Sequence, residues 1–379
     1  AMSLPSCNPA TMRVLSVFTL AGLIGCCCAF TSPPSVAKLC AAPAGWACGP
    51  SSPRVGHSFS ARAGSVPGGR QLLGGLKCSE REEWEEFVLH IQKDIIQKAE
   101  EADGKGKFIE DRWERPNDTG YGITRVMEGG NIWEKAACSV SVVRGKLSKE
   151  RAAAMSSRGR DASEGDAYFA AACSLVFHSA SPVVPTFRSD VRYFEVVGGD
   201  GWYGGGADLT PYYLYDEDAE AFHRFYKGIC EKHEEGSYAK YKKWCDDYFY
   251  IPARKEHRGV GGIFFDDLAS LPDGSSPMAF AKEVAEGFMP SYLPIANKRK
   301  EEAFTQEQRD WQLLRRGRYL EFNLLYDRGV RFGLDGQGRT ESVMVSAPPL
   351  IAWRYRADPE PGTEEHRLCG VLAEPREWA

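Results

Sequence analysis

Acidic residues are missing from the first 79 positions of this 379-residue sequence, so all 52 aspartates and glutamates lie from Glu80 onward. Basic residues occur on both sides of that point, so the chain after residue 78 is more acidic than the net charge of −5 indicates. This acidic part shows no basic stripe, which argues against nucleic acid as a partner. The hydrophobic share of 43% is enough to bury a sizeable core.

Long hydrophobic runs are missing as well. The apolar segment VLSVFTLAGLIGCCCAF, residues 14–30, has about the length of a secretory h-region and is too short for a convincing membrane span. An acid-free stretch rich in Ser, Pro, Ala, Gly and Arg follows Ala29-Phe30. Residues 1–78 therefore resemble the bipartite leader of algae with complex plastids, which is a signal peptide followed by a transit peptide. We expect a disordered leader, a mature chain without a transmembrane span, and delivery to the plastid stroma. A disordered or mispredicted N-terminus is the alternative.

The motifs of several common enzyme and metal-site classes are absent. Five cysteines follow residue 78, with no CxxC and no metal-ligand spacing, which fits a reducing compartment and not a disulfide framework. No HxxxH or HExxH encodes a local metal site, and there is neither a P-loop nor GxSxG. The segment GWYGGGADLTPYY, residues 201–213, lacks GxGxxG spacing, so a dinucleotide site has weak support.

Periodicity predicts a single α+β domain over residues 79–379, built on a largely antiparallel sheet. A capping box at Ser79 and Glu82 begins an amphipathic helix that Gly104 ends. Strands are expected on both sides of the Gly-Gly-Asn turn at 129–131, on both sides of the prolines at 182 and 185, and over 261–268. Further helices are expected over 146–157, 216–235, 238–248, 277–297 and 305–316. Residues 318–332 have the pattern of a strand pair, or of a strand and a turn.

Polar residues alternate with apolar ones after the second of those prolines. In a strand, the period of two puts Arg188, Asp190 and Arg192 on one face, and the opposite face is apolar apart from Ser189. Such a strand is either half buried with a wet side or lines a pocket for an anionic ligand. The glycines of the following GGGADLT form a tight turn, or they let the backbone approach a flat ligand with Asp208 as acceptor.

Arginines offer a second indication of the ligand. Planar guanidinium groups bind carboxylates through two parallel hydrogen bonds, so several arginines around one cleft imply a polycarboxylate. Arg328 follows Asp327 directly, but neighbours in a strand point to opposite faces and need not neutralise each other. The arginines considered are Arg188, Arg192, Arg254, Arg258, Arg318, Arg328, Arg331 and Arg339. Arginines scattered over the surface are the alternative.

Four long strings resemble the oxygen-dependent coproporphyrinogen III oxidases: WYGGGADLTPYYLYDEDAEAFHRF, KKWCDDYFYIPARKEHRGVGGIFFDDL, RRGRYLEFNLLYDRGVRFGL and GRTESVMVSAPPLIAWRY. The resemblance covers residues 79–378. It implies a large antiparallel sheet flanked by helices on both faces, a homodimer, and a cleft for a cyclic tetrapyrrole. It also implies the reaction, in which dioxygen converts two propionates of coproporphyrinogen III to vinyl groups and protoporphyrinogen IX forms. We expect dioxygen as co-substrate, no required organic cofactor and no metal ligands, although metal dependence is disputed within the family.

The resemblance also implies roles for individual residues. As the catalytic residues we expect Asp208, which accepts pyrrole N–H groups and stabilises positive charge on the ring, and Arg192. The expected substrate-binding residues are Ser174, His178, Arg192, Asp208, Arg328, Gly338 and Arg339. His178 and His223 match two of the family's four motif histidines.

The chain departs from the family pattern at the other two motif histidines. Arg188 stands where the proposed proton donor is expected, Asp190 replaces an asparagine beside it, and Ala253 replaces the fourth histidine. An arginine stays protonated at neutral pH and is a poor proton donor. We expect Arg188 and Asp190 to form a compensated pair on the pocket face.

These departures leave three functional interpretations. The first is an active plastid coproporphyrinogen oxidase in haem and chlorophyll biosynthesis. The second is a catalytically impaired paralogue that binds a tetrapyrrole or a partner oxidase. The third is an oxygen-using enzyme that acts on a related tetrapyrrole.

Overall fold

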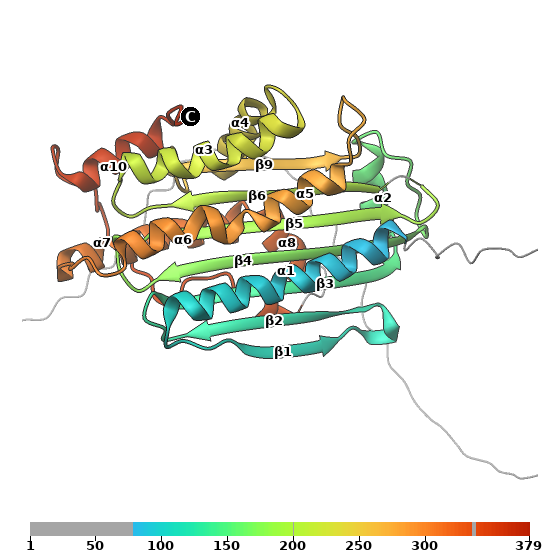
Figure 1. Ribbon diagram of the computed structural model, residues 1–379, viewed down its shortest axis with the longest axis horizontal. Coiled ribbons are helices and arrows are strands. Elements are labelled where there is room, and N and C mark those ends of the chain that lie inside the picture. Colours follow the sequence, from blue (N-terminus) through green and yellow to red (C-terminus); the bar gives the residue numbers. More distant parts are fainter. Residues whose placement is uncertain (1–78, 200, 336–338) are drawn as a thin grey trace, which may run out of the picture. The chain divides into compact units, whose positions relative to one another are not determined.

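A seven-stranded antiparallel sheet dominates the computed structural model, which describes residues 79–199, 201–335 and 339–379. Its strand order is β1–β2–β3–β4–β5–β6–β9, so each strand up to β6 pairs with its neighbour in sequence (Figure 1). The strands are β1 (Ile109–Glu114), β2 (Gly120–Glu128), β3 (Trp133–Lys146), β4 (Ala167–Ser179), β5 (Thr186–Val196), β6 (Gly201–Thr210) and β9 (Gly261–Leu268). A short ribbon of β7 (Tyr250–Ile251) and β8 (Glu256–His257) lies outside this sheet. The predicted fold class is confirmed.

Helices connect the later strands and follow the sheet. They are α1 (Glu80–Asp103), α2 (Lys149–Ser156), α3 (Asp216–His233), α4 (Ser237–Phe249), α5 (Pro277–Glu286), α6 (Phe288–Arg299), α7 (Gln306–Leu325), α8 (Arg328–Asp335), α9 (Thr340–Met344) and α10 (Glu364–Ala373), with a 3₁₀ turn at Pro116–Asp118. None of the helices in these described ranges is long and apolar enough to cross a membrane. The predicted leader, residues 1–78, lies outside the described residues.

The main core lies between one face of the sheet and the helices α1, α5 and α6, which cross that face in Figure 1. The capping box of α1 forms as predicted, and Gly104 ends the helix with a left-handed backbone. Trp84 and Val88 on α1 are fully buried against the sheet. The buried amide of Gln92 donates to carbonyls of Ile123 and Cys138, which fixes α1 over β2 and β3.

The opposite face of the sheet is covered by α7, α8 and α9. Tyr319 of α7 packs on Ala137 and Val176, and Ser342 of α9 hydrogen-bonds Thr124 of β2. In Figure 1, α8 is seen behind β4 and β5. Helices therefore flank both faces of the sheet, and the second face carries the candidate site.

The predicted strand at 318–332 is wrong. Residues 306–325 form one continuous helix, because Trp311, Arg315, Tyr319 and Phe322 recur at helical spacing and are all buried. Asp327 and Arg328 consequently do not alternate across a strand. The predicted helix at 277–297 is two helices, α5 and α6, divided at Gly287.

The glycine-rich segment before Asp208 is a strand and not a tight turn. Gly206 lies between β5 and β9, and a side chain there would place its Cβ 2.5 Å from the backbone oxygen of Ile263. At Gly204 a Cβ would lie 2.8 Å from the guanidinium of Arg192. The glycines therefore let neighbouring strands and side chains approach the middle of the sheet closely.

Candidate active site

A cavity of about 1130 Å³ lies between the second face of the sheet and the helices α8 and α9. Its floor comes from β3 to β6, and its far side includes residues of α8 and α9. The cavity is large even among small-molecule sites, which usually occupy 300–1,000 Å³. This volume favours a bulky ligand over a small acid.

Strand register places the predicted polar residues in rows across this floor. Ser174 of β4 pairs with Asp190 of β5, and Asp190 pairs in turn with Gly206 of β6. One row further along β5, Arg188 pairs with Asp208. Side chains at paired positions point to the same face, and all five residues line the cavity. The sequence therefore predicted correctly that Arg188, Asp190 and Arg192 share a pocket face.

Asp208 forms a buried ion pair at the floor of the cavity. Nη2 of Arg258 lies 2.7 Å from Oδ1 and 2.8 Å from Oδ2 of Asp208, and both side chains are almost completely buried. Rings of Phe249, Tyr319 and Phe322 surround the guanidinium within 3.9–4.8 Å of their centroids. This packing fixes the carboxylate at the edge of the cavity.

Opposing effects act on the charge of Asp208. Burial raises the pKa of its carboxyl group, and the guanidinium of Arg258 opposes that rise. Arg188, directly across from it on β5, also favours the charged form, whereas Asp190 disfavours it. The two arginines thus support an ionised carboxylate in a site that otherwise penalises charge.

Arg192 lies between two carboxylates. Its Nη1 is 2.6 Å from Oδ2 of Asp190, and its Nη2 is 3.1 Å from Oδ1 of Asp266 on β9. Burial alone would lower the pKa of Arg192, but the two carboxylates outweigh it and raise the pKa. The guanidinium is therefore permanently charged and held in one orientation over the floor.

The predicted pair between Arg188 and Asp190 does not form. Nη1 of Arg188 donates to the backbone oxygens of Leu175 and Ser189, at 3.1 and 3.0 Å. Asp190 pairs with Arg192 instead. The prediction was wrong because arginines stand both two residues before and two residues after Asp190. In a strand both lie on the same face as Asp190, so the period of two cannot show which of them forms the pair.

Arginines gather around the cavity, as the sequence indicated. Arg328 and Arg339 both line it, from the start of α8 and the start of α9. Arg339 is paired with Asp111 of β1, and Arg328 lies 4.0 Å from Asp266. Gly338 lies outside the described residues. The described arginines that line the cavity are Arg115, Arg144, Arg151, Arg158, Arg188, Arg192, Arg328 and Arg339.

His178 is not among the residues that line the cavity, and its contact with the substrate stays a prediction. It lies on the correct face of β4, but the ring of Tyr319 covers it at 5.2 Å. Its two ring nitrogens are hydrogen-bonded to Thr186 Oγ1 and to the backbone oxygen of Ser346. Burial lowers the pKa of His178 well below its ordinary value. The histidine is a neutral core residue.

The other motif histidine that the chain retains is also in the core. His223 of α3 is hydrogen-bonded to Tyr238 Oη and to the backbone oxygen of Val260. Burial lowers its pKa to about 3. Of the four motif positions, only residue 188 lines the large cavity.

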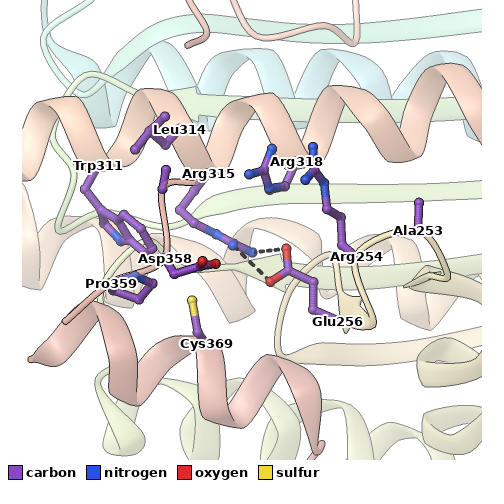
Figure 2. Close-up of a pocket in the computed structure, with 11 residues that line it drawn as sticks. Ala253, Arg254, Glu256, Trp311, Leu314, Arg315, Arg318, Asp358, Pro359 and Cys369 are labelled. Atoms are coloured by element: carbon purple, nitrogen blue, oxygen red, sulfur yellow. Dashed lines mark hydrogen bonds and ion pairs between the residues drawn. The ribbon is translucent and has the colours of Figure 1, made fainter. Parts of the chain in front are cut away.

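The fourth motif position borders a different, smaller cavity of about 220 Å³. Figure 2 shows Ala253 there, at the edge of a cluster that includes Arg254, Arg315 and Arg318. The charges in this cluster are matched internally: Arg315 pairs with Glu256, and Arg254 and Arg318 both pair with Glu321. A cavity with this volume and charge balance does not suit a large polycarboxylate.

Metal ligation has little support in this geometry. Among the residues that the structure describes, no group of three or more His, Cys, Asp or Glu side chains is placed to hold a metal ion. His178 and His223 already use both ring nitrogens in hydrogen bonds. The absence of metal ligands nevertheless stays a prediction.

Comparison with known proteins shows the family to which the chain belongs. The family model described as coproporphyrinogen III oxidase matches residues 83–378. The chain belongs to the coproporphyrinogen III oxidase family. It is 43% identical to an oxygen-dependent coproporphyrinogen-III oxidase of Drosophila melanogaster over 316 residues, which cover 81% of this chain and 80% of the fly protein.

Plant and mammalian members of the family are similarly close. Coproporphyrinogen-III oxidase 1, chloroplastic, of Arabidopsis thaliana is 44% identical over 79% of this chain and 80% of its own length. The mitochondrial oxygen-dependent enzyme of Homo sapiens is 45% identical over 77% of this chain and 66% of its own length. Family members thus include proteins named for either organelle.

Several residues of the site were not predicted. The sequence distinguishes Arg258 from none of the other arginines, because its pairing with Asp208 joins positions 50 residues apart. Asp266, the second partner of Arg192, lies at the end of β9. The two aspartates in GGIFFDDL indicate a charged strand end, but no pattern in the sequence predicts that one of them contacts Arg192 on β5.

Proposed function

We propose that this chain is an oxygen-dependent coproporphyrinogen III oxidase, active in tetrapyrrole biosynthesis. The observation that supports this most strongly is the position of Asp208, an Arg258-supported carboxylate on the floor of a large, arginine-lined cavity. Dioxygen is the co-substrate implied by the oxygen-dependent relatives. Each of two propionates would lose carbon dioxide and become a vinyl group, and one dioxygen would be reduced to hydrogen peroxide for each.

The charges of the cavity suit such a substrate. A porphyrinogen with four propionates carries four carboxylates, and guanidinium groups are their best binding partners. Its pyrrole N–H groups converge toward the centre of the ring. Each oxygen of Asp208 accepts one bond from Arg258 and keeps a further lone pair, so the carboxylate can also accept N–H groups of the ring.

Asp208 would act on the transition state through its fixed negative charge. Oxidation of the ring develops positive charge on the pyrrole nitrogens, and a preorganised carboxylate stabilises that charge without reorganising. The site has no need of a proton donor at residue 188 for this step. The guanidinium of Arg188 instead supports the ionised form of Asp208 across the strand pair.

The location of the replaced histidines favours an active enzyme over an impaired paralogue. Ala253 borders the small cavity of Figure 2, so the histidine lost there would not reach a ligand in the large one. At residue 188 the change exchanges a titratable side chain for a permanent cation. Asp208, Arg192 and Ser174 line the floor of the large cavity.

Turnover of coproporphyrinogen III by the purified protein, in air and under nitrogen, tests the proposal. We expect a dioxygen-dependent product with two vinyl groups and two propionates. Binding without turnover would support the impaired paralogue, and a different oxidised product would support an enzyme for a related tetrapyrrole.

We further propose that the mature protein is a homodimer in the stroma of a complex plastid. The support is the family resemblance for the dimer, and the composition of residues 1–78 for the location. Analytical ultracentrifugation tests the first point. For the second, N-terminal sequencing of the native protein should find cleavage near Phe30 and again near residue 78, and an intact start at Met12 would contradict it.

A further inference from the structure

Arg115 is an arginine of the large cavity without an acidic partner. It directly follows β1, where its backbone N–H donates to the oxygen of Gly120, and its side chain lines the cavity. Nη2 donates to Ser141 Oγ at 3.3 Å, and Nε is buried without any hydrogen-bond partner. In the described ranges no carboxylate lies within ion-pair distance of it. A half-buried cation in this state lacks the counter-charge that would offset its desolvation.

Three other arginines around the cavity are paired with carboxylates of the protein, whereas Arg188 donates to backbone oxygens and lies across the strand pair from Asp208. Arg192 has two carboxylate partners, Arg339 is paired with Asp111, and Arg144 is paired with Glu85. Arg115 therefore differs from them in charge balance and not merely in position. Burial lowers the pKa of Arg115, and the neighbouring Arg151 acts in the same direction.

The side chain of Arg115 is nevertheless held in a defined place. Its guanidinium stacks on the ring of Trp113, 4.8 Å from the ring centroid. Trp113 lies against Gly122 of β2, where a Cβ would approach the indole to 2.4 Å. The indole Nε1 of Trp113, which also lines the cavity, is a second buried donor without a partner. Both donors belong to residues that line the cavity, and N–H donors of this kind are suited to a carboxylate.

We propose that Arg115 binds a propionate of the substrate that does not react, with the indole N–H of Trp113 as a second donor. This inference rests on the function proposed above. Ser141, which Arg115 contacts, lies on β3 in the same row as Ala172 on β4 and Arg192 on β5. Two strand spacings, about 10 Å, separate Ser141 on β3 from Arg192 on β5. A tetrapyrrole ring bridges such a gap, with its reacting edge near Arg192 and a retained propionate at Arg115.

Two measurements test this assignment. One is steady-state kinetics with coproporphyrinogen III, and the other is fluorescence titration with coproporphyrin III, the oxidised form that does not react. Because one charge-assisted contact is lost, Arg115→Gln should raise both KM and Kd about 10- to 100-fold, with the loss falling on KM rather than kcat. Arg115→Lys, which keeps the charge, should recover part of the affinity. Arg112→Gln is the matched control, because Arg112 is an exposed arginine of β1 that stacks on Tyr121 and does not line the cavity.

Unchanged KM and Kd in Arg115→Gln would overturn the assignment, as would a loss confined to kcat or an equal effect of Arg112→Gln. The two proposals fail in different ways. If the parent protein binds coproporphyrin III but turns nothing over, the proposed activity is wrong, and the Kd ratio between parent and Arg115→Gln still decides the role of Arg115. If the parent neither turns over coproporphyrinogen III nor binds coproporphyrin III, both are wrong.

Discussion

Asp190 forms an ion pair with Arg192 and not with Arg188, and this difference can be tested by measuring the coupling free energy of each pair. Asp190 and Arg192 are joined by a 2.6 Å charge-assisted contact, whereas Arg188 donates to backbone oxygens. We therefore expect a strong coupling free energy between Asp190 and Arg192, and a weak one between Asp190 and Arg188. Both couplings can be measured with double-mutant cycles on the free energy of unfolding.

The magnitude follows from the geometry. Two unit charges about 4 Å apart attract by about 4 kcal/mol at the effective dielectric constant near a protein surface. The side chains of Asp190 and Arg192 remain 24% and 32% exposed, so solvent screening reduces this value. We expect a coupling of about 1.5–3 kcal/mol for Asp190 with Arg192, the usual range for a hydrogen bond to a charged group. For Asp190 with Arg188 we expect less than about 0.5 kcal/mol.

The assay is urea unfolding of the parent, Asp190→Asn, Arg192→Gln, Arg188→Gln and the two double variants. Arg192→Gln also removes the closer of the two arginines beside Asp266, but this cost is the same in both backgrounds and cancels in the cycle. A coupling of Asp190 with Arg188 that equals or exceeds its coupling with Arg192 would refute the arrangement described above.

Three further predictions concern pH, charge and metal. Burial lowers the pKa of His223 to about 3, so the unfolded chain binds one more proton than the folded protein between pH 3 and pH 6.5, and stability is lost as the pH falls through this range. In His223→Gln, the free energy of unfolding measured with urea should therefore rise less steeply with pH there, by about 1.4 kcal/mol per pH unit. Arg258→Gln removes the cation that opposes the raised pKa of Asp208, so the acid limb of the kcat/KM profile should move to higher pH, whereas Arg258→Lys should move it less. Protein purified without chelator should contain no stoichiometric manganese, iron or copper, and chelators should leave turnover unchanged; one bound equivalent per chain would count against the account.

Local patterns in the sequence predicted much of the sheet and part of the site. The capping box and Gly104 fix α1, and the turn at 129–131 fixes the β2–β3 hairpin, because these signals depend on residues close together in the chain. The period of two placed Arg188, Asp190 and Arg192 on the correct face for the same reason.

Local patterns could not predict which helices and distant segments pack on each face of the sheet. His178 shares the face of Ser174 on β4, but α7 covers one and leaves the other open to the cavity. In α7, Leu320, Phe322 and Leu324 recur at a spacing of two and so resemble a strand, whereas the burial of Tyr319 and Phe322 on one helix face becomes evident only in the packed structure. The partner of Asp208 likewise comes from a distant loop.

Asp208 carries the central claim, and the turnover of Asp208→Asn tests it. Removing the carboxylate leaves Arg258 buried and unpaired, which is expected to cost about 3–5 kcal/mol of stability. The double variant Asp208→Asn with Arg258→Gln removes both charges and therefore serves as the folded reference, verified by circular dichroism.

The most direct measurement is kcat for coproporphyrinogen III in air, determined for the parent, the single variant and the double variant at a temperature where all three are folded. A charged, preorganised acceptor is worth about 10²- to 10³-fold in rate, so both variants should lose at least that factor while still binding coproporphyrin III. Turnover within a few-fold of the parent in either folded variant would contradict the assignment of Asp208.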